Sequence, residues 1–404
     1  MNVADIVSIS VFVLLMAFFL YKKRDKISIE KIVYPALYMI MYRTSFGLKF
    51  MNSVAKKRRN LVQFLGYTFI GLAFLGMVYI SVAIIVVIIM FLIKPAAVDT
   101  GFVLVLPGTS IPGIGYLSFW YWIISIFILA IVHEFAHGIV ARAHDLDLKS
   151  SGFAFLAIFL PVIPAAFVEP DEKKLVKRKD IVQYSVFAAG PMANIILAFI
   201  IFLLMPYVWN PSAYAPFEIK ITEPVGFSFS VPNATAPSAI AGIQSGMIFN
   251  SIDNVNGTES LLFLRTMLSL KPNQTVVLGS VEGKTYSVLT IEHPDLKGAG
   301  YFGVNLNSIK NERMIKNEYK SISPAYYWFK GLFKWLFILN FLIGLANLLP
   351  LGIVDGGRML QVALHNIMKD KKKANKVWGF ITILFVLLLV VGLAGHYLKV
   401  WGLF

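Results

Sequence analysis

Residues 116–140 read YLSFWYWIISIFILAIVHEFAHGIV, an apolar run that contains a single charged residue, Glu134. The run is long enough to cross a bilayer as one helix, which takes about 20 residues. His133 and His137 stand four positions apart, so they share one face of a helix and can bind one metal ion, with Glu134 between them placed to act on a water molecule. A metal site of this kind hydrolyses amide bonds, and here it would lie at membrane depth.

The composition of the whole chain is that of a polytopic membrane protein. Of its 404 residues, 57% are hydrophobic and only 15% are charged, whereas about a quarter of the residues of a soluble domain are charged. The net charge of +15 is carried largely by basic residues beside apolar segments, so we interpret it as a topology signal and expect no nucleic-acid partner. Cysteine is absent, which excludes thiolate catalysis, disulfides and cysteine-ligated zinc.

Six segments are apolar and long enough for a crossing, namely residues 6–21, 61–93, 116–140, 181–209, 335–351 and 377–395. The first is followed by basic residues and has no Ala-x-Ala cleavage pattern, so we expect a retained anchor. Two further stretches do not fit a straight crossing. Residues 32–42 contain Pro35 and are expected at the interface, while residues 152–168 contain Pro161 and Pro164 and are expected to form a re-entrant hairpin or β-like loop beside the active site.

The basic loops indicate which side of the membrane faces the cytoplasm. They comprise residues 22–26, 56–59, 142–180 and 369–376. With six crossings they all lie on one side, and the positive-inside rule makes that side cytoplasmic, so that the N-terminus and the hydrophilic segment 212–311 lie outside. Glycosylation acceptors at Asn233, Asn256 and Asn273 fall in that segment and support the orientation. We therefore expect a multi-pass integral membrane protein whose active site opens toward the cytoplasm.

Catalytic zinc normally takes three protein ligands, so the histidine pair needs a third residue from elsewhere in the chain. Asp355 is the strongest candidate. It closely follows an apolar run, it precedes Gly356 and Gly357, where backbone can approach closely, and a carboxylate at membrane depth is costly without a partner such as a metal.

The remaining histidines are weaker candidates for the third ligand. A single histidine in an apolar helix is more often a hydrogen-bonded contact between helices than a ligand. We expect His144 to be a solvated loop residue, His293 to lie in the outer segment, and His365 and His396 to be structural.

Two asparagines in apolar segments are candidates for contact with a substrate or with the oxyanion of the reaction. Asn194 follows Gly190 and Pro191; we expect these two to serve packing, and Asn194 either to face the cleft or to pack between helices. Asn347 precedes Asp355 and can donate to a substrate carbonyl, the alternative being a hydrogen bond between helices.

These residues resemble the motifs of the site-2 protease family of intramembrane zinc metalloproteases. The first motif of that family, HExxH in a membrane helix, matches residues 133–137, and the second, Asn-x-x-Pro followed by four residues and Asp-Gly, matches residues 347–356. Residues 190–194, GPMAN, look like its glycine-proline helix. Many bacterial members have Asn-x-x-Pro-x-Pro-x-x-Asp-Gly, whereas here Gly352 and Val354 occupy the intervening region, so the support of the backbone beside the aspartate is an open question.

The resemblance implies a role for each residue of the two motifs. Zn²⁺ would be bound by His133, His137 and Asp355, and Glu134 would be the general base. Asn347 would assist the binding of substrate or oxyanion.

The outer segment 212–311 resembles a protease-associated PDZ domain in residues 241–248, AGIQSGMI. Alternating apolar residues at 275–278 and 286–291 predict strands, and residues 260–270 predict a helix. A PDZ-like domain would bind an extended peptide by strand addition and so filter substrates, the alternative being an unspecialised folded insert.

The predicted organisation has four parts. An anchor helix and a basic interfacial segment occupy residues 1–60, the first part of a membrane catalytic core occupies 61–211, the outer PDZ-like α+β domain occupies 212–311, and the second part of the core occupies 312–404. The predicted function is hydrolysis, by an intramembrane zinc metalloprotease, of peptide bonds within or near the transmembrane helix of membrane-anchored substrates. One alternative is an intramembrane metal transporter, which explains the ligands but gives Glu134 no task. Another is a non-catalytic receptor in which the outer segment binds peptides.

Overall fold

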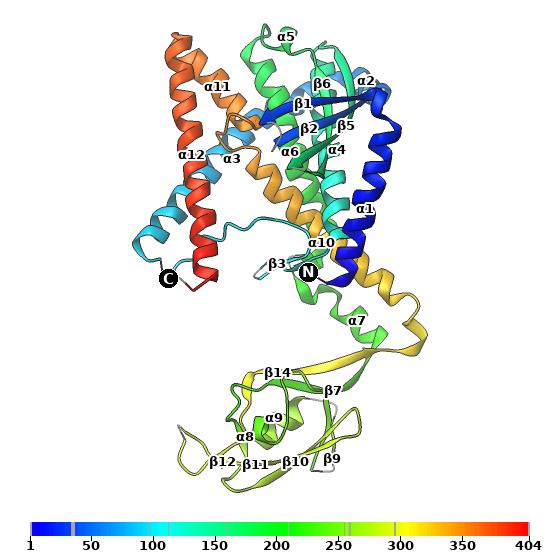
Figure 1. The fold of residues 1–404 in the computed structure, drawn as a ribbon, viewed down its shortest axis with the longest axis vertical. Helices are drawn as coiled ribbons and strands as arrows, with labels where there is room; N and C mark the ends of the chain where they lie inside the picture. The colour runs from blue at the N-terminus through cyan, green and yellow to red at the C-terminus, as the bar shows by residue number, and fades with distance from the viewer. Residues whose placement is uncertain are drawn as a thin grey trace. The chain divides into compact units, whose positions relative to one another are not determined.

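The computed structural model describes residues 2–33, 37–95, 97–111, 113–158, 160–208, 210–253, 255–257, 260–294 and 296–402. The chain forms two units, of which unit 1 consists of Met1–Trp209 and Phe329–Phe404 and unit 2 of Asn210–Trp328. Figure 1 shows long helices around a small sheet in unit 1, and a second sheet with short helices in unit 2. The predicted outer segment, 212–311, lies within unit 2.

Among the described residues, six helices are long and apolar enough to cross a membrane, which is the predicted number. They are α1 (Val3–Lys22), α3 (Arg59–Ile93), α4 (Phe119–Ala143), α6 (Asp180–Leu204), α10 (Ser323–Ala346) and α12 (Lys371–Val400). Shorter helices are α2 (Leu48–Lys57), α5 (Glu172–Leu175) and α11 (Asp355–Met368).

The predicted bounds of α10, 335–351, were wrong at both ends. The helix begins at Ser323, and Lys330 and Lys334, which interrupt the apolar run in the sequence, lie within it and find partners in the fold. Lys330 lies over the ring of Tyr207, and Lys334 Nζ donates to the carbonyl oxygen of Ile114 at 2.6 Å. The helix ends at Ala346, where the chain turns toward Asp355.

Unit 1 contains a four-stranded antiparallel sheet in the order β1-β2-β5-β6. Its strands are β1 (Ile27–Val33), β2 (Leu37–Thr44), β5 (Leu148–Ile158) and β6 (Leu160–Pro170). The hairpin of β5 and β6 confirms the hairpin predicted for residues 152–168, and β6 is an edge strand. The stretch 32–42, predicted to lie at the interface, falls on the end of β1 and the start of β2. Its residues 34–36 lie outside the described residues.

The two faces of this sheet differ in polarity, because successive side chains of a strand point to opposite faces. One face carries Ser28, Glu30, Met39, Met41, Arg43, Phe167 and Glu169. On that face Arg43 binds Glu169 with two hydrogen bonds, Nη2 to Oε1 at 2.9 Å and Nε to Oε2 at 3.3 Å, which holds the pKa of the Glu169 carboxyl below its ordinary value. The pair ties the central strand β2 to the end of the edge strand β6.

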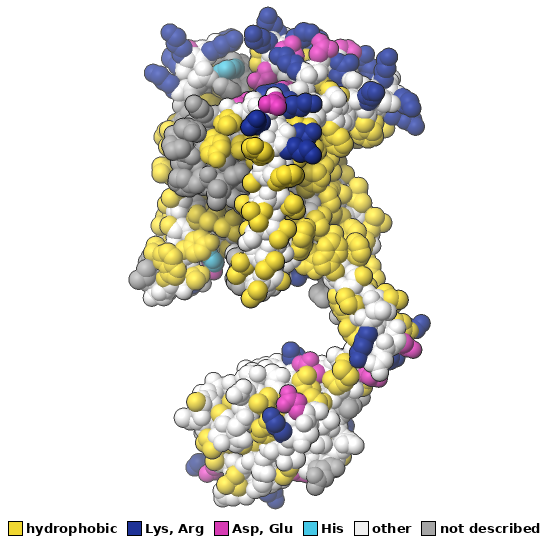
Figure 2. All heavy atoms as spheres, turned by 45° about the vertical axis from the view of Figure 1, so that its right-hand side comes forward, with side chains coloured by type: hydrophobic (Ala, Val, Ile, Leu, Met, Phe, Trp, Pro, Cys, Tyr) yellow, Lys and Arg dark blue, Asp and Glu magenta, His cyan; other side chains and the backbone are white. Residues whose placement is uncertain are grey.

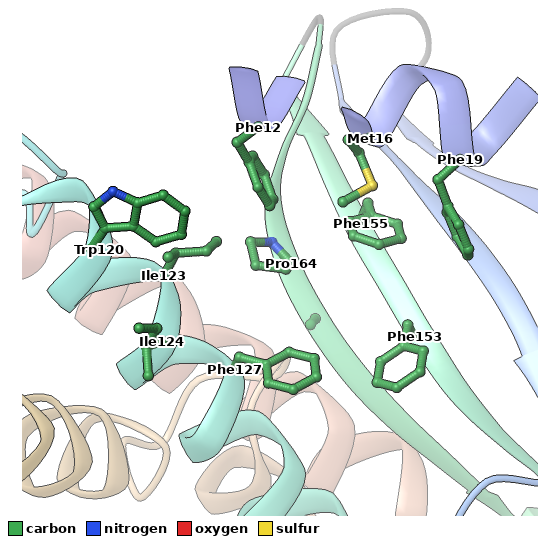
Figure 3. A pocket seen from close by; sticks show the side chains of 11 residues that line it. Phe12, Met16, Phe19, Trp120, Ile123, Ile124, Phe127, Phe153, Phe155 and Pro164 are labelled. Atoms are coloured by element: carbon green, nitrogen blue, oxygen red, sulfur yellow. The ribbon is translucent and has the colours of Figure 1, made fainter. Parts of the chain in front are cut away.

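The other face of the sheet is apolar and borders a groove of about 490 Å³. In Figure 3, Phe153 and Phe155 of β5 and Pro164 of β6 form one wall of this groove. The other walls come from α1 and α4, through Phe12, Met16, Phe19, Trp120, Ile123, Ile124 and Phe127.

Helix α1 is bound to the start of α4 through a buried carboxylate. Asp5, 3% exposed, accepts a hydrogen bond from the backbone N–H of Phe119 at 2.8 Å and a second from the hydroxyl of Tyr116. A carboxylate satisfies the free N–H groups at the first turn of a helix and interacts favourably with its dipole. One wall of the apolar groove is therefore fixed at this end.

Unit 2 is a small α+β domain whose main sheet has the strand order β11-β10-β8-β7-β14. These strands are β7 (Thr222–Ser230), β8 (Phe249–Ile252), β10 (Thr275–Ser280), β11 (Thr285–Leu289) and β14 (Asn305–Ile315). Helix α9 (Ser260–Leu268) and strands β10 and β11 confirm the elements predicted for 260–270, 275–278 and 286–291. The core is aromatic, with Phe263 stacked on both Phe227 and Phe229 at centroid distances of 4.7 and 4.9 Å.

The remaining α-helices and β-strands are short. In unit 1 they are β3 (Thr109–Ile111) and β4 (Gly115–Leu117), and in unit 2 they are α7 (Ala215–Ile221), α8 (Pro237–Ile240), β9 (Val255–Asn256), β12 (Ile291–Glu292) and β13 (Gly300–Tyr301).

Candidate active site

Among the described residues, one group of histidine and carboxylate donor atoms converges closely enough to hold a metal ion, and it consists of His133, His137 and Asp355. The two Nε2 atoms lie 3.1 Å apart, and Asp355 Oδ2 lies 3.1 Å from His133 Nε2 and 3.2 Å from His137 Nε2. The histidines come from α4 and the aspartate from the first turn of α11, 218 positions from His137 (355 − 137). The fold therefore brings together the three residues that the sequence singled out.

This donor set fits zinc. In a tetrahedral site with bonds of about 2.0–2.1 Å, neighbouring donor atoms lie about 3.3 Å apart, close to the three separations found here. Two imidazoles and one carboxylate are also the ligand types of a catalytic site, which keeps a position open for water.

Helix α6 supports both histidines from behind. His137 Nδ1 donates to the backbone carbonyl of Val186 at 2.7 Å, which leaves Nε2 free as a ligand atom. His133 Nδ1 faces the side-chain amide of Asn194 at 3.2 Å. The rings are thus oriented by groups on one neighbouring helix.

Gly190 lies between these two supports and permits the close approach of α6. A Cβ atom at Gly190 would lie 2.6 Å from His133 Nε2 and still closer to His137 Nε2, inside the space where the donor atoms meet. The prediction that Gly190 serves packing therefore understated its role, since the atoms against which it packs are the ligand nitrogens. Pro191 lies within α6, which continues through it to Leu204.

The aspartate is held by a tight turn between α10 and α11. The backbone N–H of Gly356 donates to the carbonyl of Asn347 at 2.8 Å. A side chain on Gly356 or Gly357 would collide with carbonyl oxygens of this turn, which is why the two glycines follow the ligand.

Trp378 of α12 buttresses the same turn from outside. Its indole Nε1–H donates to the carbonyl of Gly357 at 2.8 Å. Its ring also packs closely against Gly352, where an added Cβ atom would lie only 2.8 Å from Cζ2 of the tryptophan. The backbone beside Asp355, whose support the sequence left open, is therefore held by this tryptophan.

Glu134 contacts the edge strand of the sheet. Its Oε2 accepts a hydrogen bond from the backbone N–H of Val168 in β6 at 2.9 Å, while no described residue donates to Oε1. The edge strand, the glutamate and the three donor atoms thus lie around one space.

That space is a cleft of about 790 Å³, and all its lining residues belong to unit 1. Its mouth carries charged residues, among them Arg358, which pairs with Glu172 at 2.8 Å and lies over the ring of Phe187 at 4.3 Å. The cleft is therefore open to water on a polar side, opposite to the apolar groove across the sheet.

The two predicted asparagines lie at different places. Asn347 lines the cleft, and its Nδ2 donates to the carbonyl of Ile343 within α10 at 3.1 Å. Asn194 is 0% exposed and faces the back of the His133 ring.

The other histidines make contacts outside the group of donor atoms. His365 Nε2 lies 2.7 Å from Asn375 Oδ1, and His396 Nδ1 lies 2.8 Å from Asp99 Oδ1, in line with the structural roles expected of them. His293 belongs to unit 2.

The prediction that His144 is solvated was wrong. It is 7% exposed, its Nε2 lies 3.1 Å from Ser185 Oγ of α6, and its ring packs against Tyr67 of α3. Burial, together with the nearby Arg178, lowers the pKa of the imidazole. The polar neighbours of His144 in the sequence do not reveal that two helices cover this loop.

A helical core with two histidines, a carboxylate and an adjacent glutamate is the arrangement of metallopeptidases with an HExxH helix. Comparison with known proteins gives the family. The model of peptidase family M50 matches residues 121–391, more than half of the chain. The chain belongs to this family, which is the site-2 protease family.

A relative from Methanocaldococcus jannaschii, the uncharacterized protein MJ0971, is 27% identical over 363 residues. The match covers 87% of this chain and 84% of the relative.

Proposed function

We propose that this chain is an intramembrane zinc metalloprotease that cleaves peptide bonds within or near the transmembrane helix of membrane-anchored proteins. The observation that carries the proposal is the convergence of His133, His137 and Asp355, with Glu134 beside them, in helices long and apolar enough to cross a membrane. The M50 family membership supports the same reaction class.

The residues of the cleft divide the work of hydrolysis. The three donor atoms would hold Zn²⁺, which supplies Lewis acidity toward the scissile carbonyl and toward water. Glu134, which lines the cleft, would take the proton from the attacking water and pass it to the leaving amine. Asn347, on the cleft wall, is placed to stabilise the oxyanion once its amide turns from Ile343.

Strand β6 is placed to hold the substrate extended. The N–H of Val168 points away from β5 toward Glu134, so the alternation of the strand turns the N–H and C=O of Ala166 to the same open edge, together with the C=O of Pro164. A helical substrate hides its carbonyls in internal hydrogen bonds and must unwind before it is cut. An unwound segment that adds to this edge would lie beside the glutamate.

Replacement of Ala166 by proline tests this role of β6, because proline removes the N–H without adding a charge. Cleavage of a transmembrane substrate is expected to fall at least tenfold, while zinc content stays unchanged. Ala166→Val is the control, since it keeps the N–H. Equal cleavage by the two variants would contradict strand addition.

The apolar groove of Figure 3 is proposed to receive the substrate helix before it unwinds. Its lining is apolar, and its β6 wall continues to Val168 and the cleft. Because the chain has no cysteine, single-cysteine cross-linking is clean. Phe127→Cys is expected to cross-link to a substrate with a cysteine in its transmembrane helix, and Leu75→Cys, on the exposed side of α3, is the control.

We propose the orientation from the distribution of basic residues. Figure 2 shows Lys and Arg side chains gathered at one end of unit 1, above a band of hydrophobic side chains. The positive-inside rule favours the cytoplasm for that end. With six crossings, the N-terminus and the segment 212–311 would then lie outside, and the active site would open toward the cytoplasm. Cleavage would then release a cytoplasmic fragment, as in regulated intramembrane proteolysis.

Unit 2 is proposed to be PDZ-like and to bind extended peptides. Its strand β14 stands at one end of the sheet order, and strand addition to such an edge is a common mode of peptide recognition. Titration of the full chain with peptides that carry a free or an amidated carboxyl terminus tests whether unit 2 recognises a free carboxyl terminus. Negligible binding of both peptides would contradict peptide binding and favour an unspecialised folded insert.

The decisive experiment for the whole proposal is Glu134→Gln in the purified full chain. A general base contributes about 10²–10⁴-fold, so cleavage of a model transmembrane substrate is expected to fall by that factor while bound zinc is retained. A metal transporter would bind zinc but cleave no substrate, with or without the substitution. A peptide receptor would bind its peptides equally well in both forms. Unchanged cleavage by Glu134→Gln would refute the assignment.

A further inference from the structure

The side chain of Asn194 is fully buried and presents the wrong group to its neighbour. It is 0% exposed, and its Nδ2 lies 3.2 Å from Nδ1 of His133. Its Oδ1 is buried as well and accepts no hydrogen bond from any described residue. A buried carbonyl oxygen without a partner costs about 1–3 kcal/mol, so this arrangement calls for an explanation.

The chemistry of a metal-binding imidazole decides which amide atom belongs there. When Nε2 of His133 binds a metal, the ring proton resides on Nδ1, which is then a hydrogen-bond donor. An amide NH₂ group is also a donor, so the two groups would repel each other. Rotation of the Asn194 amide by about 180° brings Oδ1 to Nδ1, where it accepts the ring proton, and moves Nδ2 to the position that Oδ1 held.

The spacing along α6 supports this orientation. Val186, Gly190 and Asn194 are four positions apart, so they lie on one face of α6, and this face meets the face of α4 that carries His133 and His137. The carbonyl of Val186 accepts from His137 Nδ1. An oxygen from Asn194 completes the same arrangement for His133, with the glycine between the two supports.

We propose that Asn194 accepts a hydrogen bond from Nδ1–H of His133 through Oδ1, and that it is a positioning residue that fixes the tautomer and ring of one metal ligand. This role takes the place of the contact with substrate or oxyanion that the sequence analysis considered for Asn194. The inference rests on the metal centre of the proposed function.

The test measures zinc affinity of the full chain by competition with a chelator, with Zn²⁺ alone as the probe. Loss of a hydrogen-bond partner behind a ligand typically lowers metal affinity about 10–100-fold. Asn194→Leu is expected to show that loss, whereas Asn194→Asp keeps an acceptor oxygen and is expected to stay within about threefold of the wild type. If Nδ2 were the true partner of a bare Nδ1, Asn194→Asp would lose affinity like the leucine variant.

Asn340→Leu is the matched control. Asn340 is also 0% exposed in a long apolar helix, and its Nδ2 donates to Leu336 within α10. Its removal is expected to alter the melting temperature of the metal-free protein but not the zinc affinity. The proposal is overturned if Asn194→Leu binds zinc as tightly as the wild type, if Asn340→Leu weakens binding equally, or if the wild type binds no zinc. Wild-type protein that binds zinc without cleaving substrates would refute the peptidase proposal and leave this one standing.

Discussion

Histidine meets aspartate at two places in the described part of unit 1, and only one of them has the geometry of a metal site. At the first, Asp355 contacts His133 and His137 between α4 and α11. At the second, Asp99 in the loop after α3 contacts His396 of α12. The distances are similar, 3.1 and 3.2 Å against 2.8 Å, so distance does not separate the two places.

The number of converging donor atoms and their supports separate them. At the first place three donor atoms meet, the second nitrogen of each ring faces a group on α6, and Gly190 leaves the space clear. At the second, one carboxylate that is 48% exposed accepts from one imidazole and from the backbone N–H of Gly101. A histidine–aspartate contact is therefore a structural tie unless further donor atoms share its space and supports fix their orientation.

Removing the carboxylate should impair function at the first place and leave function unchanged at the second. Asp355→Asn takes away one of three ligands, so zinc affinity is expected to fall by more than the roughly 100-fold typical of a lost supporting residue, and cleavage should fall with it. Asp99→Asn should leave zinc content and cleavage at the wild-type level. Metal analysis and cleavage of a transmembrane substrate measure both, and loss of zinc from the Asp99 variant would erase the distinction.

Removal of the metal should distinguish Asp355→Asn from Asp99→Asn a second time, by its effect on the melting temperature. A ligand present at 100 times its dissociation constant stabilises the folded protein by about 2.7 kcal/mol, so a chelator is expected to lower the melting temperature of the wild type. Asp99→Asn should show the same decrease and Asp355→Asn almost none. A decrease of equal size in all three proteins would mean that the chelator acts elsewhere.

The sequence predicted the two histidines, the glutamate and the aspartate because their chemistry is local. A spacing of four places His133 and His137 on one helix face, and an aspartate followed by two glycines next to an apolar run is costly without a partner. The number of crossing helices followed from apolar runs in the same way, and the proline-containing stretch 152–168 was correctly predicted to fold as a hairpin.

The contacts that support the site were not predictable, because each joins segments far apart in the chain. Gly190 looked like a packing residue, and its importance depends on which atoms of α4 it faces. Trp378 lies in the predicted last crossing, 377–395, and nothing in its sequence neighbourhood marks it as a support of Asp355. His144 was misjudged for the same reason, since its burial comes from α3 and α6 and not from its neighbours in sequence.

Trp378 offers a finer test of what holds the first place together. Trp378→Phe keeps an aromatic ring beside Gly352 but loses the hydrogen bond to the carbonyl of Gly357. A lost hydrogen bond of about 1 kcal/mol corresponds to a fewfold change, so zinc affinity is expected to fall about three- to tenfold. Trp401→Phe, at the exposed end of α12, is the control and should bind zinc as the wild type does. Equal affinities of the two variants would show that the turn around Asp355 needs no buttress.

The smallest expected effect belongs to the second place and depends on pH. The hydrogen bonds from His396 and from the N–H of Gly101 hold the pKa of Asp99 below its ordinary value of 3.8. A lowered carboxyl pKa contributes stability that is present above the unfolded pKa and is lost as the pH falls through the folded pKa.

The wild type should therefore melt at a higher temperature than Asp99→Asn at pH 5–7, and the difference should shrink below about pH 4. Because the carboxylate is 48% exposed, solvent screens the pair and the difference should stay under about 1 kcal/mol. A difference that persists undiminished to pH 3, measured by thermal unfolding in detergent, would mean that the hydrogen-bonded carboxylate of Asp99 is not its source. Helix α12 would then be held to this loop by other contacts, such as the hydrogen bond from Thr100 to the carbonyl of Gly392.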